Sequence, residues 1–203
     1  MPSHSLYRPT QLSCGHLYGF GYGGDPEAGA RLARLMQHAD FLLDIRYRPA
    51  SRTLHVWNRT ALEKVYGTRY AWVQALGNQN YQHRERGIAL GTGSLHALTA
   101  CVQVVASGLS LVLLCGCREE AHCHRLLVKE QIEGWLANPN SFIPVRFGCG
   151  DDAGMYAWGR ALAHAAHTLG LDSDVVLEAV ERRIAVLRSQ GREDVERTAK
   201  AVP

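Results

Sequence analysis

The stretch 109-LSLVLLCGCREEAHCHR-125 decides the fold, because it passes from a continuous apolar run into a dense group of polar side chains. Its first part, 109-LSLVLLC-115, is typical of a parallel strand that helices cover on both faces. Its second part, 115-CGCREEAHCHR-125, holds three cysteines, two histidines and two arginines, and it leads into a helical pattern. The stretch therefore predicts a strand-to-helix turn at the ligand-binding edge of a parallel sheet.

The same alternation of apolar runs and helical patterns continues on both sides of this stretch. It predicts a three-layer α/β fold of the Rossmann-like kind, with a mainly parallel sheet flanked by helices. The domain would span residues 16–150 after a lead-in at 1–15. Its further strands are expected at 16–22, 41–46, 70–76 and 142–147, and its helices at 25–39, 59–66, 94–107 and 121–137.

From residue 151 the alternation gives way to two helical segments, 153–169 and 172–189. In the second segment, apolar residues recur on one side of the helix. These residues are Val176, Val180, Ile184 and Leu187. The pattern predicts a C-terminal helical extension over 151–203 that either packs on the sheet domain or forms a homo-oligomer interface. The polar residues 190–203 are expected to fray.

The composition excludes several classes of protein. A net charge of +3 and a pI of 8.6 over 203 residues are too mildly basic for a histone-like protein. The sequence shows neither a secretory signal nor an apolar stretch long enough to span a bilayer. We therefore expect a cytoplasmic protein with no membrane association, in which the six cysteines remain thiols.

Arginine and histidine side chains follow the strands at the end where ligands bind. Because parallel strands end on the same edge of a sheet, these side chains are expected around one crevice. Such a crevice favours an anionic ligand, for which a nucleotide or a nucleic acid is the natural candidate. The expected ligand-binding residues are Gly21, Arg46, Arg52, Asn78, Arg84 and Arg125.

The candidate catalytic residues are Cys123, His124 and Asp44. Cys123 lies near a helix start between two histidines and is followed by Arg125, and such surroundings stabilise a thiolate. Cys123 would be the nucleophile or a redox thiol, and His124 would be the acid/base or its orienting partner. Asp44 would position an arginine or a general base. The alternative interpretation is structural, with Cys123 as a small buried residue and Arg125 as a salt-bridge partner.

No cofactor is predicted, although zinc is left open. Gly19, Gly21 and Gly24 match the G-x-G-x-x-G pattern, but the helix start signal follows all three glycines, which argues against a dinucleotide. The atoms for a zinc site are present in the second part of the opening stretch. They belong to Cys115, Cys117 and Cys123, with His122 or His124. Their spacing differs from the usual two short ligand pairs.

Three blocks of the sequence together resemble a bacterial and archaeal family, the domain of unknown function 488. The blocks are 19-GFGYGG-24, 42-LLDIRYRPASR-52 with 75-ALGNQNY-81, and 113-LLCGCREEAHCHRLL-127. The matching residues are Gly21, Asp44, Arg46, Pro49, Gly77, Asn78, Cys115, Cys123, His124 and Arg125. Members of the family commonly carry Glu at the position of Cys117. The resemblance covers about residues 16 to 147 and implies the same α/β sheet.

The leading hypothesis is an enzyme that acts on a phosphorylated ligand, either a nucleotide or a nucleic acid. One alternative is a non-catalytic nucleic-acid-binding module, in which aromatic side chains near the arginines stack on bases. These aromatic residues are Tyr47, Trp57, Tyr70 and Trp72. The other alternative is a structural domain stabilised by zinc.

Overall fold

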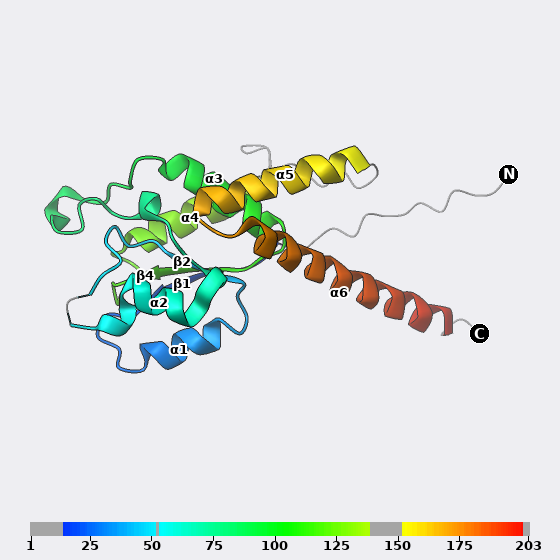
Figure 1. The fold of residues 1–203 in the computed structure, drawn as a ribbon, viewed down its shortest axis with the longest axis horizontal. Coiled ribbons are helices and arrows are strands. Elements are labelled where there is room, and N and C mark those ends of the chain that lie inside the picture. Colours follow the sequence, from blue (N-terminus) through cyan, green and yellow to red (C-terminus); the bar gives the residue numbers. More distant parts are fainter. Residues whose placement is uncertain (1–13, 52, 139–151, 201–203) are drawn as a thin grey trace.

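A computed structural model describes residues 14–51, 53–138 and 152–200 of the chain (Figure 1). Four parallel strands form one sheet in the order β1-β4-β2-β3. They are β1 (Leu17–Gly21), β2 (Phe41–Asp44), β3 (Tyr70–Trp72) and β4 (Leu111–Cys115). Each lies inside a stretch for which the sequence predicts a strand. The strand predicted at 142–147 falls outside the described residues.

Strand β4 occupies the centre of the sheet and is buried along its whole length. Its side chains alternate between the two faces, as the pleat of a strand requires. Leu111 and Leu113 belong to one hydrophobic core, and Val112 and Leu114 belong to the other. The continuous apolar run of the opening stretch is thus explained by cores on both sides.

Helices form the two outer layers, which confirms the predicted three-layer α/β fold. Helices α1 (Ala28–Leu35) and α2 (Arg59–Tyr66) cover one face of the sheet, and α3 (Ser94–Ala106) and α4 (His124–Ala137) cover the other (Figure 1). The segments that connect these elements contain short 3-10 helices. They are η1 (His55–Trp57), η2 (Gly67–Arg69), η3 (Gln74–Leu76) and η4 (Arg84–Arg86).

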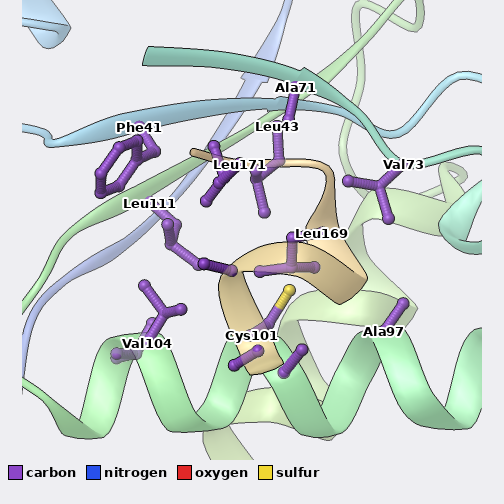
Figure 2. Packing of buried hydrophobic residues seen from close by; sticks show 14 of the residues in the cluster. Phe41, Leu43, Ala71, Val73, Ala97, Cys101, Val104, Leu111, Leu169 and Leu171 are labelled. Atoms are coloured by element: carbon purple, nitrogen blue, oxygen red, sulfur yellow. The ribbon is translucent and has the colours of Figure 1, made fainter. Parts of the chain in front are cut away.

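The C-terminal helices pack on the sheet domain. Leu169 at the end of α5 (Asp152–Leu169), and Leu171 after it, lie between α3 and the sheet (Figure 2). At the start of α6 (Ser173–Lys200), Val176 and Val180 are fully buried in the same core. The first two residues of the apolar stripe are therefore used inside the molecule.

Several helix boundaries differ from the sequence prediction, and helix α1 is shorter at both ends than the predicted 25–39. Helix α6 continues to Lys200, through residues for which the sequence predicts fraying, and Figure 1 shows its C-terminal half extending away from the sheet. Helix α4 begins at His124, because Cys123 adopts extended backbone angles and its sulfur accepts a hydrogen bond from the Arg125 N–H at 3.4 Å. Within the described ranges, no helix is both long and apolar enough to cross a membrane.

Candidate functional site

Three neighbouring strands end side by side, and the predicted site residues lie there. Gly21 at the end of β1 is in register with Cys115 at the end of β4, and Asp44 at the end of β2 is in register with Leu114. We call this end of the sheet, together with the loops that follow the three strands and the start of α4, the carboxyl edge. Because β4 lies between β1 and β2, the loops that follow these strands meet there.

Asp44 and Arg46 form a buried ion pair at the carboxyl edge. The Arg46 Nε donates to Asp44 Oδ1 at 2.7 Å, and Arg46 Nη2 donates to Asp44 Oδ2. The Tyr70 hydroxyl donates to the same Oδ2 at 2.9 Å, and Arg46 Nη1 donates to the Tyr22 hydroxyl at 2.9 Å. Burial disfavours the charged guanidinium, but the Asp44 carboxylate outweighs it and raises the pKa of Arg46. Asp44 thus positions an arginine, which is one of the two roles that the sequence suggests for it.

Two of the aromatic residues proposed to stack on bases are buried in this network instead. Trp57 stacks on Tyr22 with ring centroids 4.4 Å apart, and Tyr70 is buried beneath Asp44. Trp72 is half-buried, and its indole N–H donates to the Arg46 carbonyl at 2.9 Å. Three of the four rings thus already have partners within the protein, and the fourth, Tyr47, lies against the exposed Tyr81 with ring centroids 6.0 Å apart.

Two cysteines and a histidine converge beside this ion pair. We call Cys115, Cys123 and His124 the Cys–His cluster. The Nδ1 atom of His124 lies 3.9 Å from the sulfur of Cys115 and 3.7 Å from the sulfur of Cys123. All three possible ligand atoms lie within 4.8 Å of one another. The three residues are 3%, 2% and 7% exposed, respectively, so the cluster is almost dry.

The backbone of β2 fixes the orientation of the His124 ring. The Nε2 atom lies 2.8 Å from the carbonyl oxygen of Ile45, which is an acceptor only. Nε2 therefore carries the hydrogen atom and donates a hydrogen bond to this carbonyl. Nδ1 presents its lone pair to the two sulfurs. Burial lowers the pKa of His124, which favours this neutral form.

A third cysteine, Cys117, influences the ionisation of the two cluster thiols. Hydrogen bonds from Cys117 and Cys123 lower the pKa of Cys115 to about 3. The same hydrogen bonds raise the pKa of Cys123 and of Cys117, because these two thiols act as donors to the Cys115 sulfur. These directions favour a thiolate on Cys115 over one on Cys123, whereas the sequence pattern points to Cys123.

Arg125 links the cluster to the turn that precedes it. Its side chain is buried, its Nε lies 3.4 Å from Glu120 Oε1, and its Nη1 donates to the Cys117 carbonyl at 3.4 Å. A Cβ atom added to Gly21 would overlap the same carbonyl oxygen. Gly21 therefore makes room for the turn between β4 and α4, and Arg125 already has an anionic partner.

The other predicted site residues do not join the cluster. Asn78 Oδ1 accepts the backbone N–H groups of Asn80 and Ala89, each at 3.0 Å, and so holds its own loop together. The sequence allows either His122 or His124 as a ligand. In the structure His122 is exposed and His124 belongs to the cluster. Arg52 and the side chain of Arg84 lie outside the described residues.

Sequence reasoning missed three partners at the carboxyl edge. Tyr22 and Tyr70 complete the hydrogen bonds of the ion pair, and Glu120 faces Arg125. Tyr70 is the first residue of β3. A prediction that β3 pairs with β2 could therefore have placed Tyr70 near Asp44. The sequence pattern gives no comparable signal for Glu120, because it lies in an irregular turn.

A family model for a domain of unknown function, DUF488, matches residues 33–132. The matched segment contains Asp44, Arg46 and the whole Cys–His cluster. The match assigns this segment to the DUF488 family. The glycine-rich end of β1 and the helices α5 and α6 lie outside the matched segment. Comparisons with curated proteins and with solved structures gave no match.

Proposed function

We propose that this protein is an enzyme, that the carboxyl edge is its active site, and that its substrate is phosphorylated. One observation carries the proposal. Four buried residues with ionisable side chains, namely Asp44, Arg46, His124 and Arg125, all lie at this edge, and they are the only buried Asp, Glu, His, Lys or Arg in the described part of the chain. Burying charge is costly, and clusters of buried ionisable groups mark functional sites more often than other surfaces.

The phosphate contacts are assigned to the exposed arginines of the edge rather than to the buried ones. Arg46 is paired with Asp44, and Arg125 faces Glu120. Arg48 and Arg118 are exposed, and neither forms an ion pair with any residue that the structure describes. Arg118 lies beside Gly23 and Gly24, between the loops that follow β1 and β4. A guanidinium in that position can bind phosphate oxygens with two donors.

Replacing Arg118 by alanine is expected to weaken binding of a phosphorylated ligand about tenfold, because a hydrogen bond between charged groups contributes about 1.5 kcal/mol. The probes are adenosine triphosphate and a short single-stranded oligonucleotide, each titrated at low and at moderate salt. The salt dependence should become shallower in the variant, because one phosphate contact is lost.

Arg34→Ala is the matched control for this experiment. Arg34 is also exposed, but it lies in the last turn of α1, away from the carboxyl edge. If the two variants bind both probes equally well, or if the wild-type chain binds neither probe, the proposed ligand class is wrong. Preferential binding of the oligonucleotide would favour a nucleic-acid substrate over a free nucleotide.

A further inference from the structure

We propose that the Cys–His cluster binds one Zn²⁺ ion, with Cys117 as the fourth ligand. The proposal assigns a metal to Cys115, Cys123 and His124, and it is independent of the phosphate contacts proposed for Arg118. It rests on the spacing of the three ligand atoms, on the second hydrogen bond of His124, and on the charged group next to the cluster.

The spacing of the ligand atoms fits a tetrahedral zinc site. Zinc bonds of about 2.3 Å to sulfur and about 2.0–2.1 Å to nitrogen, at tetrahedral angles, place sulfur and nitrogen about 3.6 Å apart. The observed distances from His124 Nδ1 are 3.7 Å to the Cys123 sulfur and 3.9 Å to the Cys115 sulfur. These atoms therefore already lie about as far apart as two ligands of one ion.

His124 has the second hydrogen bond that zinc-binding histidines usually form. Such histidines bind the metal through one ring nitrogen and donate the other N–H to a carboxylate or a backbone carbonyl. Here Nε2 donates to the Ile45 carbonyl at 2.8 Å, and the lone pair of Nδ1 points at the sulfurs. The ring is thus oriented for a ligand at Nδ1 before any metal binds.

The surroundings of the cluster suit a zinc-thiolate centre. Three thiolates and one Zn²⁺ ion carry one net negative charge. The buried guanidinium of Arg125, which is shared with Glu120, belongs to the residue next to His124 and offsets part of that charge. The Arg125 backbone N–H already donates to the Cys123 sulfur at 3.4 Å. Soft sulfur ligands combined with an imidazole favour zinc over magnesium or calcium, which prefer oxygen.

Cys117 supplies the fourth position. It lies in the turn between β4 and α4, two residues after Cys115, with a half-buried side chain, and its carbonyl oxygen accepts a hydrogen bond from Arg125 Nη1 at 3.4 Å. Its sulfur is not among the ligand atoms that lie within 4.8 Å of one another, so it would move toward the ion on binding. After that movement, the two cysteines of 115-CGC-117 would bind the ion from the end of β4, and the pair Cys123-His124 would bind it from the start of α4. This is the arrangement of two short ligand pairs in three dimensions, although the spacing in sequence is unusual.

The first test is elemental analysis of the full chain purified without chelator, which should show about one zinc ion per chain. The zinc is then removed and Co²⁺ is titrated into the chain. The expected spectrum has thiolate-to-cobalt charge-transfer bands and the intense d–d bands of a tetrahedral ion. A chain that contains no zinc and gives no charge-transfer bands with Co²⁺ would overturn the proposal.

Paired variants then identify the ligands. Cys123→Ser and His124→Gln should weaken zinc binding by more than about 100-fold, since loss of even an outer partner of a ligand costs about 10–100-fold. His122→Gln and Cys14→Ser should bind zinc as the wild type does, because both residues are exposed and lie outside the cluster. Equal losses in the two sets would contradict the assignment.

Cys117→Ser keeps the test decisive if the other variants do not fold. It should still take up cobalt, with charge-transfer intensity reduced by about one third because one of three thiolates is gone. Unchanged intensity would remove Cys117 from the ligand set. Failure of zinc binding would leave the proposed phosphate site standing, because Arg118→Ala tests that site without changing a ligand of the metal.

Discussion

Asp44→Asn should lower the free energy of unfolding by about 3–5 kcal/mol, because it leaves the charge of Arg46 buried without its counter-charge. Both carboxylate oxygens of Asp44 accept hydrogen bonds from the Arg46 side chain, and Oδ2 also accepts one from Tyr70. An amide in place of the carboxylate turns one of these acceptors into a donor that faces other donors. Urea unfolding of the two chains measures the effect as a shift of the midpoint at constant slope.

Glu63→Gln provides the matched control for Asp44→Asn. The Nε of Arg59 lies 2.6 Å from Glu63 Oε1, so this ion pair has nearly the same length as the buried one. Both partners are close to half exposed, and pairs of this kind contribute about 0.2–1 kcal/mol. A midpoint shift no larger for Asp44→Asn than for Glu63→Gln would show that the buried pair does not stabilise the fold as argued.

The sheet and the place of Asp44 could be predicted because both depend on strong local patterns. The apolar run that becomes β4 alternates between two cores, which is the pattern of a central parallel strand. Once the strands are parallel, their ends must share an edge, and Asp44 and Cys115 are brought close by that rule alone. This part of the site can therefore be predicted without knowing how the loops fold.

The direction of the arginine side chains could not be predicted, because it depends on partners far away in sequence. Arg46 turns inward toward Asp44 and Tyr22 rather than outward toward a ligand. Its Tyr22 contact joins the loops after β1 and β2, which pack against each other only in the folded chain. The sequence therefore predicts an arginine-rich edge but does not show which arginines remain exposed.

The choice between the two histidines follows from the helix boundary. Successive side chains on a helix are rotated by about 100°, so the residue at which α4 begins determines which histidine faces the sheet. Because Cys123 caps the helix, His124 is its first residue and lies against the carbonyl of Ile45. A helix that began near 121, as the pattern predicts, would leave that choice open.

Gly21→Ala should lower the free energy of unfolding by about 1–3 kcal/mol, which is the usual cost of forcing an extra carbon into a packed site. The added Cβ would overlap the carbonyl oxygen of Cys117 and would lie 2.6 Å from Nη1 of Arg125. The clashing atom belongs to the backbone, so the clash can be removed only if the turn after β4 moves. Because that turn carries Cys117 and leads to Cys123, the same variant should bind zinc less tightly than the wild type.

Gly19 and Gly29 distinguish this steric effect from a general effect of replacing glycine. A Cβ on Gly19, in the same strand, would meet chiefly the end of the Glu120 side chain, which is partly exposed and can swing away. Gly19→Ala should therefore cost less than Gly21→Ala. Gly29 in α1 has open space around its Cβ position, so Gly29→Ala should stabilise the chain by about 0.5–1 kcal/mol through better helix propensity.

The order of the three variants in thermal or urea unfolding is the decisive measurement. Gly21→Ala should be the least stable and Gly29→Ala the most stable, with Gly19→Ala between them. If Gly21→Ala were as stable as Gly19→Ala and bound zinc as the wild type does, the turn would not be held against β1. The packing of the Cys117 carbonyl on Gly21 would then not position Cys117 beside the Cys–His cluster.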